Sequence, residues 1–455
     1  MKIKLISLGC PKNLVDSEVI LGKLGERGHS FTSWSDEADI IIINTCSFIK
    51  EARREAYTVI SGAIREKGIS QRIVVCGCLP QLEKRELFRH YPEIDALLGS
   101  ADFCEIDGVV DALANGASGL FSVNAPRFLY NSSFPRLLAT PPSYAYLKIA
   151  EGCSNRCSYC LVPQLRGKYR SRPIDDIVKE ARALVGLGVS ELILIAQDTT
   201  FYGRDLSKKA SLARLIEKLE TIEKLKWVRL LYTHPAHLTL SLIRTMASLK
   251  RVCRYIDLPL QHTHNEILAR MRRPQFKVVE RLINQLRERI PEIAIRTTFL
   301  LGFPGERESH FQKLLKDVEK FKFDWVGAFT YSPEKGTSAY SLGPKVPSSV
   351  KGRRYRELMK IQRSITCQKN ERFIGKGYLV LVDGKDEGHT EFQCPGIDGK
   401  IFLEDGHKPG EMILARVSAV KDYYDLTTEK KGTKKRRAAK SSCPSCQRRI
   451  GPKMN

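Results

Sequence analysis

The fold is decided by the stretch EGCSNRCSYC, residues 151–160, which directly follows the apolar, strand-like run AYLKIA (145–150). Its three cysteines, Cys153, Cys157 and Cys160, lie within eight residues, and no fourth cysteine or histidine stands beside them. A structural zinc site takes four nitrogen or sulfur ligands, typically as two separated pairs. Three thiolates instead suit three corners of a 4Fe–4S cluster and leave the fourth iron open for a substrate or cofactor.

The chain downstream of this loop alternates between strand-like and helix-like segments. Apolar runs with the length of buried strands lie at 145–150, 191–196, 227–233, 255–260, 293–302 and 325–332. Six such units fit a partial or complete (β/α) barrel of the TIM type, and an open doubly wound sheet is the alternative. We assign residues 139–370 to this unit. The cysteine loop follows its first strand, on the face where such barrels keep their active sites.

Three further residues follow barrel strands on the same face. Gln197 and Asp198 come after the second strand, and Gly302 comes after the fifth. We expect all three to line a cofactor pocket. At Gly302 the lack of a side chain would let the backbone approach the ligand. A turn before the next helix is the alternative reason for this glycine.

Residues 1–125 form a second unit, which the sequence predicts to be a parallel α/β sheet. Short buried strands are expected at 3–8, 39–43 and 72–75. Each is followed by a loop and a helix, and this order is typical of parallel sheets.

A second set of cysteines, Cys10, Cys46 and Cys78, follows these three strands. Parallel strands share a direction, so the three loops emerge at one edge, where open α/β sheets bind ligands. We therefore expect a second iron–sulfur cluster with an open iron; three buried packing residues are the alternative. Cys76 is a competing candidate. It lies in or at the end of the strand, whereas Cys78 lies in the loop, and this placement favours Cys78 as the ligand.

The rest of the chain differs in its expected secondary structure and in its composition. Residues 371–428 contain short alternating strands and turn signals, which predict a small all-β barrel of OB-like size. Residues 429–455 are basic and predicted to be disordered. Within them, Cys443 and Cys446 are half of a zinc site with no second pair nearby.

Charge and composition point to the class of partner. The formal net charge is +24, of which residues 430–455 supply +10. Such a balance suits polyanionic partners such as RNA or a ribonucleoprotein, although a basic tail is also typical of a solvated end. Thirteen cysteines favour metal or redox chemistry in a reducing compartment. With no apolar run of membrane-spanning length and no secretory signal, we expect a cytoplasmic protein without membrane contact.

Several motifs resemble known families. The spacing C-x₃-C-x₂-C, with Tyr159 before the last cysteine, resembles the signature of radical S-adenosylmethionine enzymes. GCPKNLVDSE, NTCSFI, GCLPQ, EGCSNRCSYC, RGKYRSRP and LPLQH together resemble the methylthiotransferase family. The β-rich segment that ends in YYDL resembles the TRAM domain of that family.

The resemblance implies two 4Fe–4S clusters and S-adenosylmethionine as cofactors. One cluster would be held by the 151–160 loop and the other by Cys10, Cys46 and Cys78. S-adenosylmethionine would bind the open iron of the first cluster and be cleaved to a 5′-deoxyadenosyl radical, which abstracts hydrogen from the substrate. A second molecule would supply the methyl group of the transferred CH₃S, and the second cluster would hold the incoming sulfur.

The substrate follows from the branch of the family that the chain resembles. Pro11 and Lys12 stand where the tRNA-modifying branch usually has Gln-Met, and LPLQH, ending at His262, also resembles the protein-modifying branch. This implies methylthiolation of an aspartate in the twelfth protein of the small ribosomal subunit; a modified adenosine in tRNA is the alternative. Expected partners are this protein, neighbouring rRNA and an electron donor such as a flavodoxin or ferredoxin. Lys12 and Arg166 are candidates to receive the aspartate, and no catalytic residue is assigned.

Overall fold

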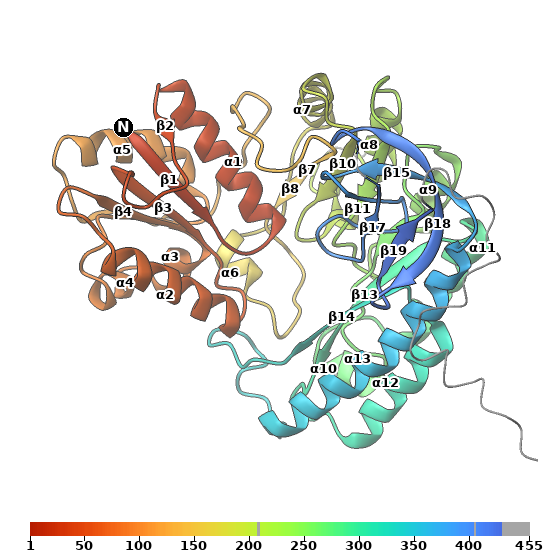
Figure 1. Cartoon of the computed structure of the whole chain (residues 1–455). Helices are drawn as coiled ribbons and strands as arrows, with labels where there is room; N and C mark the ends of the chain where they lie inside the picture. Colours follow the sequence, from red (N-terminus) through yellow and green to blue (C-terminus); the bar gives the residue numbers. More distant parts are fainter. Residues whose placement is uncertain (207–209, 405, 430–455) are drawn as a thin grey trace, which may run out of the picture.

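The protein is described by a computed structural model that covers residues 1–206, 210–404 and 406–429. Three parts follow one another along the chain: a six-stranded sheet, two three-stranded sheets surrounded by helices, and a small closed barrel. Figure 1 shows the first sheet, in red and orange, on one side of the molecule and the closed barrel, in blue, on the other. The predicted fold class is confirmed. The expectations for the basic tail, with Cys443 and Cys446, lie outside the described residues.

The N-terminal sheet is entirely parallel, with the strand order β2-β1-β3-β4-β5-β6. Its strands are β1 (Lys2–Ser7), β2 (Ser30–Phe31), β3 (Ile40–Thr45), β4 (Arg72–Gly77), β5 (Ala96–Leu98) and β6 (Leu120–Ser122). Its helices are α1 (Pro11–Glu26), α2 (Lys50–Arg65), α3 (Cys78–Glu83), α4 (Glu86–His90) and α5 (Ile106–Ala114).

Both faces of this sheet are buried. Along β3, Ile40 and Ile42 join the core under α1 and α5, whereas Ile41 and Ile43 join the core under α2, α3 and α4. A strand that is covered on both faces loses the usual apolar–polar alternation. This explains why β3 begins with four isoleucines in a row.

The central part consists of two parallel sheets, β11-β10-β7 and β12-β13-β14. Their strands are β7 (Tyr144–Lys148), β10 (Glu191–Ile195), β11 (Trp227–Leu230), β12 (Tyr255–Asp257), β13 (Ala294–Leu301) and β14 (Trp325–Thr330). A parallel bridge between Val228 and Val252 lies where the chain passes from β11 to β12. The structure is thus a partial barrel, as expected.

Helices surround this partial barrel, and all but the first of them cover its outer face; the first, Val162–Arg166, packs against α3 of the N-terminal part. They are α6 (Val162–Arg166), α7 (Ile174–Gly186), α8 (Leu212–Glu220), α9 (Leu240–Ser248), α10 (Asn265–Arg270), α11 (Phe276–Arg289), α12 (Glu308–Phe321) and α13 (Ser348–Asn370). Among the described residues, no helix is both long enough and apolar enough to cross a membrane.

Two barrel strands end earlier than their apolar runs. The run 227–233 was expected to be strand throughout, but β11 stops at Leu230, and Tyr232 has a φ of +57°. The run 255–260 likewise yields only β12, and Gln261 has a φ of +72°. Residues with positive φ leave the β region, so neither strand continues through its apolar run. After β12 an isolated parallel bridge between Gln261 and Phe299 resumes the pairing with β13.

The C-terminal barrel is closed in the order β15-β16-β17-β19-β18. Its strands are β15 (Gly377–Val382), β16 (Glu387–His389), β17 (Ile401–Phe402), β18 (Met412–Lys421) and β19 (Asp425–Thr428). It is fixed to the start of the central strands by a buried group: Glu191 accepts hydrogen bonds from Arg229 Nε at 2.6 Å and from His389 Nε2 at 2.7 Å. His389 belongs to the small barrel, so this contact joins the two parts.

Candidate functional site

The loop with Cys153, Cys157 and Cys160 is held between two short antiparallel strands, β8 (Ala150–Glu151) and β9 (Arg170–Ser171). Gly152 opens the loop with a φ of +79°, and a Cβ there would collide with the backbone oxygen of Lys168. Only glycine meets both constraints without strain. The local turn therefore sets how the three cysteines face the end of the barrel.

The three thiols border a pocket of about 550 Å³ whose far wall is formed by residues 336–338. Burial raises the pKa of Cys153 to about 11 and that of Cys160 to about 12. The guanidinium of Arg273 lies 3.9 Å from Cys157 Sγ. Because only thiolates bind metal, Cys153 and Cys160 stay protonated until a metal displaces the proton.

Cys10, Cys46 and Cys78 come from the ends of three adjacent strands, β1, β3 and β4. Gly9 has a φ of +94°, and a Cβ there would collide with the Cβ of Cys46, so the first two loops are in contact. Burial, with Cys78 and then Cys10, raises the pKa of Cys46 to about 12. The strand order thus brings together three thiols that are far apart in sequence.

The choice between Cys76 and Cys78 is decided by their surroundings. Cys76 lies within β4 and packs into the core beneath α1, away from the loops. Cys78 begins α3 and packs against Leu161 and Leu165, which directly follow the other cysteine loop. The two sets of cysteines therefore lie on facing surfaces of the N-terminal sheet and the barrel.

Neither set has the spacing of a single-ion site. Within the described residues, groups of three ligand atoms closer than 4.8 Å to one another occur only at Asp198 with His234 and His237, and at His264 with Glu266 and His310. Tetrahedral zinc at about 2.3 Å from sulfur would bring its ligands to about 3.8 Å from one another. Neither set of cysteines is such a group, so the three sulfur atoms of each set do not all lie within 4.8 Å of one another.

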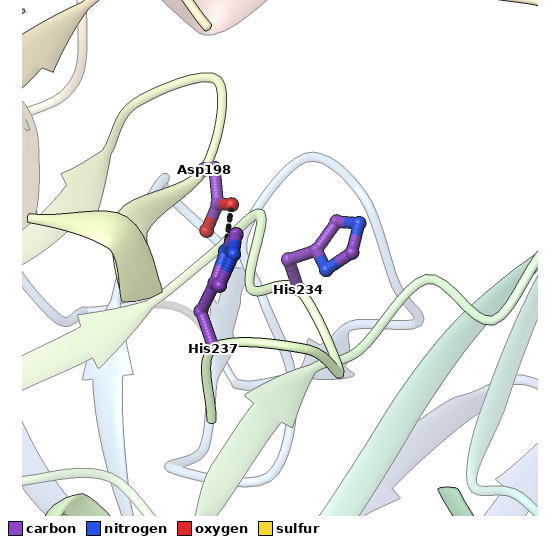
Figure 2. A group of neighbouring side chains, drawn as sticks. All are labelled: Asp198, His234 and His237. Carbon is purple, nitrogen blue, oxygen red and sulfur yellow. Dashed lines mark hydrogen bonds and ion pairs between the residues drawn. The ribbon is translucent and has the colours of Figure 1, made fainter. Parts of the chain in front are cut away.

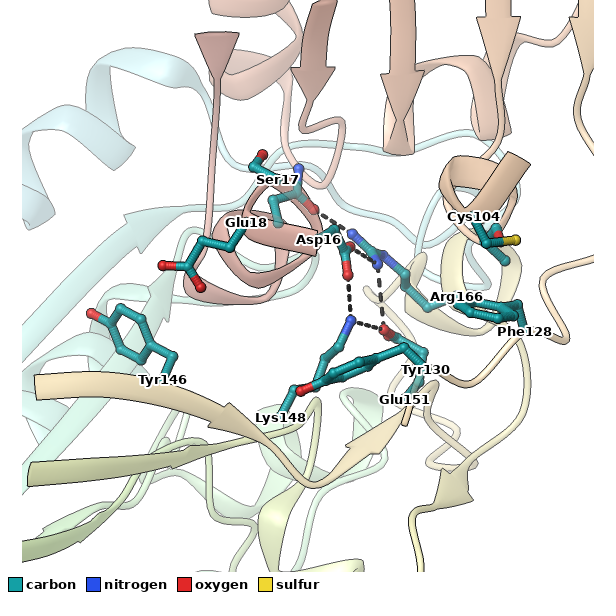
Figure 3. A network of polar contacts seen from close by, with 12 residues as sticks. Asp16, Ser17, Glu18, Cys104, Phe128, Tyr130, Tyr146, Lys148, Glu151 and Arg166 are labelled. Atoms are coloured by element: carbon teal, nitrogen blue, oxygen red, sulfur yellow. Dashed lines mark hydrogen bonds and ion pairs between the residues drawn. The ribbon is translucent and has the colours of Figure 1, made fainter. Parts of the chain in front are cut away.

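A buried ionic network joins the two sheets beside these cysteines (Figure 3). Arg166, at the end of α6, donates to Asp16 at 2.7 Å and to Asn13, both on α1. Lys148, on β7, bonds Asp16 and also Glu151 at 2.9 Å. Burial alone would raise the pKa of Glu151, but Lys148 and Arg166 lower it to about 2.

The two basic residues expected to receive the substrate differ in their surroundings. Arg166 already pairs with Asp16 and Glu151 and donates to Asn13. Lys12 instead places its Nζ 3.3 Å from the centre of the Tyr232 ring, at the barrel mouth. Burial lowers the pKa of this amine. Lys12, which pairs with no carboxylate in the described part of the chain, is therefore the better candidate to bind a ligand.

Asp198 is brought into a group that the sequence analysis missed (Figure 2). Its carboxylate accepts hydrogen bonds from Asn155 of the cysteine loop at 2.7 Å and from His237 Nδ1 at 2.6 Å. His234 accepts a backbone N–H from Ala236 at its Nδ1, so its proton lies on Nε2, which is buried and without a partner. The pair THPAH after the third barrel strand was the available signal, because polar residues at strand ends line such sites.

The remaining predicted residues have partners within the protein. Gln197 donates to Glu151, and its Oε1 is buried without a partner. Gly302 has a φ of +71°, and a Cβ there would collide with the side chain of Lys351. These constraints account for the glycine within the fold, and its role toward a cofactor stays a prediction.

Comparisons with known proteins place this geometry in a family. Residues 2–99 match the uncharacterized protein family UPF0004, residues 147–318 match the radical SAM superfamily, and residues 374–430 match the TRAM domain. A relative from Pelotomaculum thermopropionicum, the ribosomal protein uS12 methylthiotransferase RimO, is 46% identical over 94% of this chain and 99% of its own length. The chain belongs to the RimO methylthiotransferase family. The RimO of Aquifex aeolicus is 44% identical over 93% of this chain and 96% of its own length.

Solved structures support the fold. The radical S-adenosylmethionine methyltransferase TsrM from Kitasatospora setae superposes with a TM-score of 0.56 at 14% identity, covering 74% of each chain. The cobalamin-dependent S-adenosylmethionine radical enzyme OxsB gives a TM-score of 0.50 at 11% identity, over 80% of this chain and 56% of its own. At such identities the likeness concerns only the fold.

Proposed function

We propose that this protein is a radical S-adenosylmethionine methylthiotransferase that adds a CH₃S group to the β-carbon of an aspartate in ribosomal protein uS12. The observation that carries this proposal is the identity of 46% with a RimO relative along 94% of the chain. The facing sets of three cysteines add a physical reason. Two neighbouring metal centres would supply the radical and the sulfur atom separately.

The first centre is the loop of Cys153, Cys157 and Cys160, which we propose holds a 4Fe–4S cluster with S-adenosylmethionine at its open iron. The donor set fits: three thiols without a fourth ligand lie beside a pocket of about 550 Å³. Bound there, the cluster supplies the electron that cleaves S-adenosylmethionine. The chain's own part is to orient the loop through Asn155 and Asp198 and to exclude water.

Three residues are proposed to face the S-adenosylmethionine: Asp198, Gln197 and Gly302. Asp198 is fixed by His237, so its position does not depend on the ligand. Gln197 keeps a buried Oε1 without a partner, which suits an amine or hydroxyl donor. Gly302 would contribute its backbone. The unpartnered Nε2–H of His234 is a further donor for the same ligand.

The second centre is formed by Cys10, Cys46 and Cys78, which we propose hold the auxiliary 4Fe–4S cluster. Its three thiols lie at the edge of a parallel sheet, and Arg166 and Lys12 lower the pKa of Cys10 against the effect of burial. Positive charge nearby favours thiolates and any anionic sulfur species at the open iron. We also propose the domain limits 1–125, 139–370 and 371–428 for the parts that carry these centres.

Partners and location follow from this activity. A substrate in the ribosome implies a cytoplasmic enzyme that meets rRNA, in keeping with the net charge of +24. The electron for the first centre requires a low-potential donor such as a flavodoxin or ferredoxin. The net charge also keeps tRNA as the alternative substrate.

One experiment separates the two substrates. Anaerobically reconstituted protein is incubated with S-adenosylmethionine, a reductant, a sulfide source and either a uS12 peptide or tRNA, followed by mass spectrometry. We expect the peptide aspartate to exchange one hydrogen for CH₃S. Modification of tRNA alone would overturn the proposed substrate, and protein that binds zinc and no iron would overturn the chemistry.

A further inference from the structure

Lys12 is an exception among the buried cations of this protein. Six lysine and arginine side chains are buried in the described part of the chain: Lys12, Lys148, Arg166, Arg172, Arg229 and Arg354. Five of them have a carboxylate within 4 Å, namely Asp16 for Lys148 and Arg166, Asp176 for Arg172, Glu191 for Arg229 and Glu306 for Arg354. No ion pair or hydrogen bond in the described part of the chain engages the ammonium group of Lys12, which is 9% exposed.

Such a group is costly to bury. Lysine is almost never buried without a partner, because the charged group loses its hydration and gains nothing in return. The Tyr232 ring, 3.3 Å from Nζ, offers a cation–π contact, which replaces only part of that hydration. An anionic ligand would complete the site.

The position of Lys12 indicates which anion this is. The residue stands two positions after Cys10 on the N-terminal sheet, while Tyr232 follows β11 at the mouth of the barrel. The ammonium group therefore lies between the two sets of cysteines. Arg166, the other cation at this junction, is already neutralised by Asp16 and Glu151.

We propose that Lys12 binds the carboxylate of the target aspartate and so positions the carbon that reacts. This inference rests on the proposed function. In aspartate the β-carbon is bonded directly to the carboxylate carbon, so an ion pair at the carboxylate fixes the β-carbon within one bond. Lys12 acts as a positioning residue and as the feature that selects an acidic side chain over a neutral one.

The competing role for Lys12 is to balance the negative charge of thiolates around Cys10. The two roles predict different results. A charge-balancing lysine affects cluster assembly and is indifferent to the substrate's side chain. A carboxylate-binding lysine leaves the cluster in place and discriminates between aspartate and asparagine.

The test is a double-mutant cycle between enzyme and peptide. Anaerobically reconstituted wild-type, Lys12→Met and Lys12→Arg proteins are compared for binding of a uS12 peptide with its target aspartate and of the same peptide with asparagine. Binding is followed by fluorescence anisotropy, and iron is counted in each sample. Lys23→Met is the matched control, because Lys23 lies at the other end of the same helix and pairs with Asp107.

We expect Lys12→Met to weaken binding of the aspartate peptide and raise its KM by about thirtyfold or more, the fold-change that corresponds to losing one partner of a buried charge pair. Binding of the asparagine peptide and the iron content should not change, and Lys12→Arg should recover most of the affinity. Equal effects on both peptides, no effect on either, or loss of iron would overturn the inference. Failure of the wild-type protein to modify the aspartate peptide would instead overturn the proposed function.

Discussion

The two sets of cysteines reach similar arrangements by opposite routes. Cys153, Cys157 and Cys160 lie in one short loop, whose shape depends on Gly152 and the β8–β9 ladder. Cys10, Cys46 and Cys78 span 69 positions of the sequence and meet only because β1, β3 and β4 are neighbours in the sheet. The first arrangement is local, and the second depends on the whole N-terminal fold.

This difference fits the division of work that we propose for the two centres. The local loop adjoins a pocket of about 550 Å³, whereas two of the three dispersed thiols, Cys46 and Cys78, are buried and Cys10 lies beside Lys12 and Arg166. The two meet where Cys78 packs against Leu161 and Leu165. Substitutions in the two sets should therefore remove different parts of the reaction. Substitutions at the junction should weaken the contact between the N-terminal part and the barrel.

The largest effect is expected for the loop. Cys157→Ala should abolish cleavage of S-adenosylmethionine and every later step, because two thiolates do not retain the cluster. The measurement is 5′-deoxyadenosine by chromatography, together with the iron count. Cys104→Ala, which removes a partly buried thiol outside both sets, is the control and should leave both values unchanged. Cleavage at the wild-type rate in Cys157→Ala would contradict the assignment of the loop.

For the dispersed set, Cys46→Ala should leave cleavage intact and abolish methylthiolation. The reason is that the radical centre is retained while the site for sulfur is lost. Parallel measurement of 5′-deoxyadenosine and of the peptide mass checks this. If Cys46→Ala still yields the CH₃S product, the auxiliary-cluster assignment is wrong.

At the junction, Arg166→Met should lower the free energy of unfolding by about 3–5 kcal/mol, because Asp16 and Glu151 are left as buried charges without their partner. Urea unfolding of the reconstituted protein measures this. Arg89→Met is the matched control: its pair with Glu86 is exposed, and its removal should cost less than about 1 kcal/mol. If Arg166→Met lowers the free energy of unfolding no more than Arg89→Met does, the network does not join the two sheets.

The smallest effect concerns a contact outside both sets, between Glu191 and His389. Burial alone would raise the pKa of Glu191, but Arg229 and His389 lower it from 4.5 to about 2. The ionised Glu191 therefore stabilises the folded protein above pH 4.5, and this stabilisation is lost as the pH falls toward 2. Burial alone would lower the pKa of His389, but Glu191 and Asp383 raise it above 6.5. The protonated His389 therefore stabilises the folded protein below pH 6.5, and this stabilisation is lost as the pH rises through the raised pKa.

This contact should therefore stabilise the docked barrel most between pH 4.5 and 6.5. Thermal unfolding of wild-type and Glu191→Gln protein on either side of that window checks the dependence. The difference between them should be greatest within the window, and the iron content should be equal in both. A pH-independent difference would contradict the role of this ion pair.

Most of the fold and the two sets of cysteines could be predicted because they rest on local patterns. Alternation of strands and helices gives a parallel sheet, and strand ends in one sheet share an edge, so Cys10, Cys46 and Cys78 could be placed together without coordinates. The group of Asp198, His234 and His237 was only partly found, since it depends on two loops meeting. Short strands such as β11 could not be predicted either, because the positive φ of Tyr232 is imposed by tertiary packing.

The central claim is that the dispersed cysteines form a metal centre of their own, and one measurement tests it directly. The triple variant Cys153→Ala, Cys157→Ala and Cys160→Ala is reconstituted anaerobically with iron and sulfide, and bound metal is counted and examined by Mössbauer spectroscopy. Our account predicts about four irons per chain in a single 4Fe–4S cluster, half of the wild-type content. A variant without bound iron, or with zinc in its place, would contradict it.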